Sequence, residues 1–386
     1  MRAEVERCSR RAAGVVAFAS ISCSRAGERL GPRRAHPPPR PLPVMRRSPP
    51  RHSSTLLAAL ACAVIALAPA GAAPARLQGA EYLADLPTLL ADASGLFAEA
   101  GVAVSYDRSG KAGLERLRAG EIAFATMAMT PLVLDLLRDG DPGGADDPVV
   151  LANLAYSTEI NHVVTLASGA AGPPLSTVPA SVGLAAGTNA QFLLHLFATR
   201  HGLAPGEVPV VDLPIDALPA ALADGRVAAA VVWEPWTSRL RRRHGERLRV
   251  LDGSRLYTVR WLLVTRRAVV RERPELCHAV LDAYRAAVVR AEAEPAASRA
   301  LFARRWEVAA DVVAGIDALP IYDVTLDWTV FTSFRRQLAW ARRAGEAGGE
   351  TPASLFDLVA PACLRAVDAD AVLLPRPVPF VAEGER

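Results

Sequence analysis

The sequence predicts an α/β protein of two lobes, each with a parallel-cored sheet and helices on both of its faces. Between residues 181 and 236, short apolar runs alternate with segments of helical spacing in the order strand, helix, strand, helix, strand. The same order occurs between residues 77 and 125. Such alternation favours parallel strands joined by helical crossovers. A chain of 386 residues is also long enough for two domains.

Residues 45–73 have the order of a secretory signal peptide. Arginines follow Met45, an apolar run covers 56–67, and small residues come after it. The apolar run is too short to span a membrane as a helix. We therefore expect residues 1–75 to be a leader that directs the chain to the periplasm. Residues 1–44 are expected to be a start-site artefact ahead of the true initiator.

The net charge of +4 belongs to this leader and not to the body of the protein. The first 73 residues hold 12 arginines against three acidic groups, so the remainder is net acidic. That balance gives no reason to expect a nucleic-acid partner.

After the leader only two cysteines remain, Cys277 and Cys363, and their spacing does not decide whether they form a disulfide. No Cys or His cluster has metal-ligand spacing, so we expect no metal.

Residues 76–170 are expected to form the first part of lobe 1. Strands are predicted over 77–83, 102–106, 120–125, 149–154 and 163–166. Helices are predicted over 88–97, up to Leu117, and from Pro131.

Residues 171–260 are expected to form lobe 2, and residues 261–386 to complete lobe 1. Lobe 2 is predicted to have strands over 182–184, 208–213 and 227–232, with helices over 190–202 and 215–222. The return to lobe 1 is predicted to have a strand over 262–265 and helices over 274–289, 296–306, 326–344 and 353–358. The two links between the lobes are expected at 169–179 and 255–261. Two short links are what a hinge requires.

The first candidate site opens the helix of lobe 2, at Gly187, Thr188 and Asn189. Unpaired N–H groups at a helix start, with two polar side chains, favour a polar or anionic ligand group. The alternative is a turn glycine followed by an ordinary N-cap.

The second candidate site is Trp233-Glu234-Pro235-Trp236, directly after the last strand of lobe 2. Pro235 keeps Glu234 out of helical geometry. A carboxylate between two large rings at a strand end suits a ligand that carries donors. The alternative is two packed tryptophans beside a solvated carboxylate. The carboxyl ends of parallel strands share one edge, so both candidate sites are expected there.

Further candidates lie at strand ends of lobe 1. These are Asp85, Thr126, Met127, Tyr156 and Glu159. For the hexapeptide 156–161 a plain loop is an equally good interpretation.

Short motifs of one kind occur along residues 76–300. They include Ser94-Gly95-Leu96-Phe97, Ala119-Gly120-Glu121-Ile122, Gly187-Thr188, Trp233-Glu234-Pro235-Trp236 and Arg273-Pro274-Glu275-Leu276. Together they resemble the aliphatic-sulfonate, nitrate and taurine-binding proteins, periplasmic receptors that share their fold with thiamine-pyrimidine-precursor binders. The resemblance implies a type II periplasmic-binding-protein clamshell and a small-molecule solute held between its lobes. It also implies an ABC permease with its ATPase as partner. We expect a monomer without a cofactor.

The resemblance leaves other functions open. The same fold resembles that of a thiamine-pyrimidine synthase, which carries pyridoxal phosphate on a lysine. The one lysine of this chain, Lys111, precedes an expected helix of lobe 1, and there is no cysteine-rich iron motif, so we expect no enzyme. A sensor domain without an importer is a third possibility.

Two ligand classes also stay open. Helix starts near 109–113, at Thr130 and at 188–191 favour an oxyanion such as a sulfonate, taurine or nitrate. Carboxylates and aromatic rings at the same edge favour a pyrimidine-type ring instead. The rings are Tyr82, Tyr156, Trp233 and Trp236. We place the sulfonate class first.

Overall fold

Two mixed β-sheets organise the residues that the computed structural model describes. These residues are 73–137, 143–167, 180–204, 206–252, 255–316, 320–345 and 354–374. All of them belong to one unit, Ala68–Arg386. The other unit, Met1–Leu67, and with it nearly all of the expected leader, lies outside the described residues. The expected link at 169–179 lies outside them as well.

The larger sheet has seven strands in the order β12-β11-β4-β10-β3-β1-β2. They are β1 (Ala75–Ala80), β2 (Val102–Asp107), β3 (Phe124–Ala128), β4 (Pro148–Ser157), β10 (Val259–Arg266), β11 (Ile321–Asp327) and β12 (Val372–Leu373). β1 is parallel to β2 and β3, whereas β10 is antiparallel to β3 and β4. The expected parallel core is present, and antiparallel strands extend it on one side.

The smaller sheet has five strands in the order β7-β6-β8-β5-β9. They are β5 (Asn161–Leu166), β6 (Val182–Leu184), β7 (Val210–Asp212), β8 (Ala229–Trp233) and β9 (Leu248–Asp252). β6 is parallel to β7 and β8, and β5 is antiparallel to β8 and β9. The strand–helix–strand–helix–strand order predicted over 181–236 is therefore confirmed.

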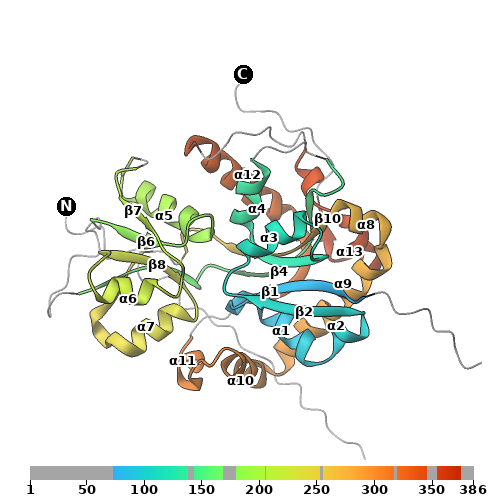
Figure 1. Cartoon of the computed structure of the whole chain (residues 1–386), viewed down its shortest axis with the longest axis horizontal. Coiled ribbons are helices and arrows are strands. Elements are labelled where there is room, and N and C mark those ends of the chain that lie inside the picture. The colour runs from blue at the N-terminus through green and yellow to red at the C-terminus, as the bar shows by residue number, and fades with distance from the viewer. Residues whose placement is uncertain are drawn as a thin grey trace, which may run out of the picture. The chain divides into compact units, whose positions relative to one another are not determined.

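Helices cover both faces of each sheet (Figure 1). Those that follow the first six strands are α1 (Leu86–Ala93), α2 (Leu96–Glu99), α3 (Lys111–Arg118), α4 (Met129–Leu136) and α5 (Asn189–Arg200). Those that follow β7 and β8 are α6 (Leu218–Ala223) and α7 (Trp236–His244). The later ones are α8 (Arg267–Glu272), α9 (Pro274–Ala293), α10 (Pro295–Arg305), α11 (Ala310–Ala314), α12 (Trp328–Arg343) and α13 (Pro361–Val367). Short 3-10 turns are η1 (Leu83–Asp85), η2 (Gly245–Arg247) and η3 (Leu355–Leu358).

The chain passes between the sheets earlier than the sequence predicted. β4 ends at Ser157 in the larger sheet, and β5 begins at Asn161 in the smaller one, so the passage occupies 158–160. The prediction that assigned 163–166 to lobe 1, with a boundary at 170–171, is wrong because this strand pairs with β8 and β9. The return between β9 and β10 overlaps the expected link at 255–261, whose last three residues already belong to β10.

Three local elements also differ from the expectation. The helix predicted over 88–97 is interrupted at Gly95, whose φ is 78°, a left-handed conformation that favours glycine. The helix predicted from Leu326 is preceded by a strand, β11, that the sequence analysis missed. The short helix expected at 353–358 is the 3-10 turn η3.

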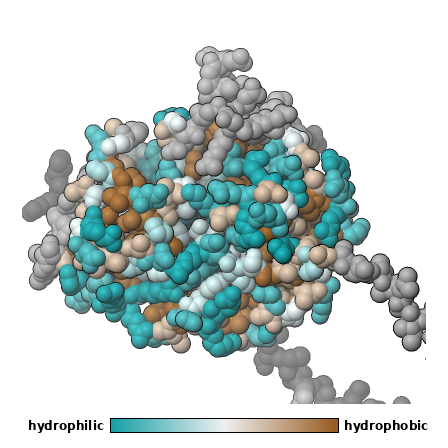
Figure 2. Space-filling view, in the orientation of Figure 1, coloured by the Kyte–Doolittle hydropathy of each residue, from teal (hydrophilic) through white to brown (hydrophobic). Residues whose placement is uncertain are grey.

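The larger buried side chains of both sheets belong to one apolar core. The edge strand β7 does not contribute all of its apolar side chains to this core, since Val210 and Val211 are 50% and 36% exposed. In the space-filling view apolar surface gathers in small patches among polar side chains (Figure 2). Among the described residues no helix is long and apolar enough to span a membrane.

Candidate functional site

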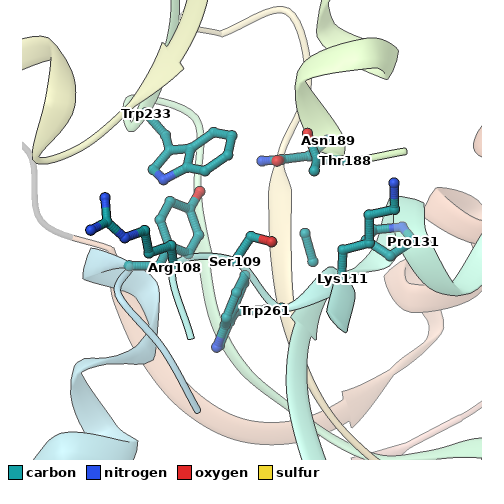
Figure 3. A pocket seen from close by; sticks show the side chains of 11 residues that line it. Arg108, Ser109, Lys111, Pro131, Thr188, Asn189, Trp233 and Trp261 are labelled. Atoms are coloured by element: carbon teal, nitrogen blue, oxygen red, sulfur yellow. The ribbon is translucent and has the colours of Figure 1, made fainter. Parts of the chain in front are cut away.

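A small pocket lies where residues of the two sheets meet (Figure 3). The larger-sheet lobe contributes Tyr82, Arg108, Ser109, Gly110, Lys111, Ala128, Pro131 and Trp261. The smaller-sheet lobe contributes Thr188, Asn189 and Trp233. Each group comes from strand ends and the helix starts that follow them, the edge where ligands bind in α/β proteins.

The turn from β2 into α3 forms one wall of the pocket. Gly110 lets this turn lie directly on β3, because a Cβ there would be 2.6 Å from the Met127 Cα and from the Thr126 carbonyl oxygen. A larger residue would push the turn away from the strand. Because Gly110 packs directly against β3, its two neighbours Ser109 and Lys111 are held at the mouth of the pocket.

Lys111 reaches across to the other lobe. Its Nζ donates to the carbonyl oxygen of Ala186 over 3.0 Å. Gly187 makes room for it: a Cβ at this position would be 2.9 Å from Nζ, and its φ of +73° also favours glycine. The ammonium group thus lies beside the start of α5, with Asn189 and Thr188 on the facing wall (Figure 3).

Ion pairs join the two lobes around the pocket. Arg108 pairs with Asp216, which precedes α6, and Arg239 of α7 pairs with Glu81 over 3.1 Å. Both arginines are bound to residues of the opposite lobe, so these pairs favour an arrangement in which the lobes are together.

Three aromatic rings form the apolar part of the pocket. Tyr82 lies between the two tryptophans, with ring centroids 4.7 Å from Trp261 and 6.1 Å from Trp233. A chain of polar contacts fixes it: Asn161 Nδ2 donates to the Tyr82 hydroxyl over 3.2 Å, and Asn189 Nδ2 donates to Asn161 Oδ1 over 3.1 Å. Burial raises the pKa of Tyr82, so its hydroxyl is a neutral donor and acceptor at physiological pH.

Trp233 presents an unused donor. Its Nε1 is buried and has no hydrogen-bond partner, although its ring lines the pocket. Figure 3 shows this nitrogen turned toward the side of the pocket where Arg108 and Ser109 lie. An unpaired buried N–H costs free energy that a ligand acceptor would recover.

Asp85 holds Trp261 from behind. Its Oδ1 accepts from Trp261 Nε1 over 2.7 Å and from Thr88 Oγ1 over 2.5 Å, while Oδ2 accepts from the Ala80 N–H over 2.6 Å. Burial raises the pKa of Asp85 to about 7, and these three donors oppose the rise. Asp85 thus positions a wall of the pocket and does not line it.

The predicted site residues fall into two groups. Thr188, Asn189 and Trp233 line the pocket. Thr188 also fits the alternative interpretation, since its hydroxyl accepts from the Ala190 N–H and caps α5. Gly187 shapes the pocket through Lys111, as described above.

The remaining predicted residues lie outside the lining. Thr126 and Met127 belong to β3, under Gly110. Tyr156 lies below the Arg260 guanidinium, which is 5.9 Å from its ring centroid, and Glu159 pairs with Arg255 over 2.7 Å. Glu234 is buried and accepts from the Ser238 N–H over 3.2 Å; burial raises its pKa.

Sequence reasoning missed Arg108 and Trp261 as lining residues. Both lie at strand boundaries, one after β2 and one near the start of β10, so strand ends were the available signal. For the helix start at 109–113 and for Tyr82, the sequence predicts only a class of ligand. No group of His, Cys, Asp or Glu among the described residues is arranged to hold a metal ion.

The chain is similar to one protein family and to several solved structures. The model of a family described as NMT1-like matches residues 81–305. No curated protein sequence matches the chain. The alkanesulfonate-binding protein SsuA from Xanthomonas axonopodis pv. citri, solved bound to MOPS, is 17% identical; the match covers 79% of this chain and 100% of that one, with a TM-score of 0.63.

Two further solved structures are similar. The periplasmic nitrate-binding protein NrtA from Synechocystis PCC 6803 is 17% identical over 77% of this chain and 89% of its own, with a TM-score of 0.57. The desulfurization enzyme DSZB is 17% identical over 77% of this chain and 99% of its own, with a TM-score of 0.55. At these identities the likeness shows a shared fold, which carries both binding proteins and an enzyme.

Proposed function

The chain belongs to the NMT1-like family, and from this premise we propose that it is the extracytoplasmic solute-binding receptor of an ABC importer. Its ligand is a small solute with an oxyanion, of the sulfonate, taurine or nitrate kind. The ligand is held in the pocket between the two lobes and presented to a permease with its ATPase. The receptor acts as a monomer in the periplasm.

The observation that carries the ligand class is the charge of the pocket lining. Lys111 supplies a cation, and Ser109, Asn189 and the Trp233 indole supply donors, whereas the charge of Arg108 is already paired with Asp216. Among the described residues that line the pocket there is no carboxylate. The three acids that argued against an anion, Asp85, Glu159 and Glu234, are each bonded elsewhere. An oxyanion is therefore favoured over a cationic or donor-rich ligand.

The same lining explains how binding would be linked to closure of the lobes. An oxyanion between Lys111 and Asn189 bonds to the larger-sheet lobe on one side and the smaller-sheet lobe on the other. Those bonds form together only when the lobes are close. A ligand shifts such an equilibrium by the difference in its affinity for the two states.

A pyrimidine-type ligand is the second candidate, and one observation favours it. Tyr82, Trp233 and Trp261 give the pocket three aromatic rings, which bind flat rings well. The rings equally suit the carbon part of an organic sulfonate. The ammonium group of Lys111 would bind the charge of a sulfonate, whereas a neutral pyrimidine has no charge for it to bind. Binding rather than catalysis is proposed because the described residues that line the pocket include no His, Cys, Asp or Glu. A Schiff-base absorbance between 300 and 500 nm would instead indicate a lysine-bound cofactor.

A ligand panel tests the proposal. Purified, unliganded protein is screened by thermal shift against alkanesulfonates, taurine, nitrate and aminopyrimidines. A ligand at about 100 times its Kd adds roughly 2.7 kcal/mol of stability, so a clear rise in Tm is expected for a sulfonate. Stabilisation by aminopyrimidines alone would reverse the order of the two classes.

Replacing Trp233 by phenylalanine should weaken binding of the best anionic ligand by roughly 10- to 100-fold, since it removes a hydrogen bond to a charged group. The ring stays, so packing changes little. Trp236→Phe is the matched control: its Nε1 is also buried and unpartnered, but the residue does not line the pocket. Isothermal titration of both variants is the measurement. Equal affinities for the two would show that the Trp233 donor is not used.

A further inference from the structure

Cys277 and Cys363 lie together, far apart in sequence and away from the ligand pocket. Cys277 is in α9 and Cys363 in α13, two helices that pack against each other. Both are buried, at 0% and 3% exposure, and both are free thiols in this structure. The two thiols lie close enough to shift each other's pKa, and Arg285 of α9 pairs with Asp368, directly after α13, over 2.7 Å, which holds the two helices side by side. Their spacing in the sequence left the pairing open, and the fold supplies the contact.

We propose that Cys277 and Cys363 form a disulfide in the exported protein, tying α13 to α9. The bond would form between the two Sγ atoms as the chain folds. The two thiols lose two protons and two electrons to a disulfide-bearing oxidant, which is reduced to its dithiol. Such oxidants are present outside the cytoplasm, so the proposal rests on export, which is part of the proposed function.

The local chemistry favours Cys363 as the attacking thiol. The neighbouring Cys277 thiol and the His278 imidazole lower the pKa of Cys363 to about 7, against the opposing effect of burial. A thiolate is the nucleophile in disulfide exchange. The partner Cys277, whose pKa is raised, would lose its proton when it closes the bond onto the mixed disulfide.

The bond has a clear structural use. Only the two-residue strand β12 follows α13 among the described residues, and it pairs with the edge of the larger sheet. A link from α13 to the long helix α9 would fix this C-terminal segment to the body of the lobe. A disulfide that closes a loop of roughly 90 residues strongly lowers the conformational entropy of the unfolded chain. It therefore stabilises the folded protein more than a disulfide that closes a short loop.

Mass spectrometry of the full chain tests the bond without using export or ligand. The purified protein is refolded with oxidised and reduced glutathione, unfolded in iodoacetamide without reductant, and digested. The expected product is a linked pair of peptides, holding Cys277 and Cys363, that separates on reduction. Alkylation of both cysteines would overturn the proposal. Because no solute is involved, this result is independent of the ligand panel.

Thermal melts give the second readout. Reduction of the refolded wild type is expected to lower its Tm by roughly 5 °C or more. Cys363→Ala, with only one of the two thiols, should show no such response to reductant. A wild-type Tm that is the same with and without reductant would overturn the proposal, even if the variant does not fold.

Discussion

Replacing Lys111 by methionine is expected to weaken the binding of a sulfonate by roughly 10- to 100-fold, the loss typical for a hydrogen bond that involves charged groups. Methionine keeps the length of the side chain and removes the charge. The loss has two physical causes: the ligand loses a cation, and the lobes lose the bond from Nζ to the Ala186 carbonyl oxygen. Isothermal titration measures the affinity.

The control for Lys111 is Arg304→Gln, which removes one positive charge from an exposed position of α10. This variant should bind as the wild type does, because its charge is not part of the pocket. Full affinity in Lys111→Met would mean that the ligand does not use the ammonium group, and the oxyanion proposal would then lose its main support.

Asp85→Asn is expected to destabilise the protein and to remove a pH dependence. An asparagine turns one acceptor oxygen into a donor, so either Trp261 Nε1 or the Ala80 N–H faces another donor. An unsatisfied buried polar group costs about 1–3 kcal/mol. Where Trp261 is the donor that loses its acceptor, the bond that holds it against Tyr82 is gone and ligand affinity falls as well.

The pH dependence follows from the raised pKa. Burial raises the pKa of Asp85 from 3.8 to about 7, so between these values the folded protein keeps a proton that the unfolded chain has released. Its stabilising contribution is therefore complete below about pH 4 and is lost as the pH rises through about 7. The difference in unfolding free energy between wild type and Asp85→Asn should be largest at acid pH and become smaller toward pH 8. Denaturant unfolding of both proteins across this range is the measurement.

The opposite result is equally informative. A difference that grows as the pH rises would show that the three donors to Asp85 outweigh burial and hold its carboxylate charged. Comparing wild type with the variant removes contributions that both proteins share. Those include Glu234, whose pKa burial also raises.

The sequence by itself determined the fold class, because the alternation of apolar runs and helical spacing is a local property of the chain. It also placed Thr188, Asn189 and Trp233 at strand and helix ends, where parallel strands present their carboxyl edge. These features depend on neighbours within a few residues. Local pattern was therefore enough to predict them.

Tertiary structure alone decided which sheet β5 joins and which polar groups are free to meet a ligand. The apolar pattern of a strand does not show which strand it pairs with. The sequence therefore did not predict that the chain passes between the lobes at 158–160, ahead of the expected link. Asp85 was a plausible ligand contact until its partner was known, and that partner, Trp261, is 176 positions away in the sequence. A buried polar group is satisfied by whatever the fold places beside it. Sequence spacing does not contain that information.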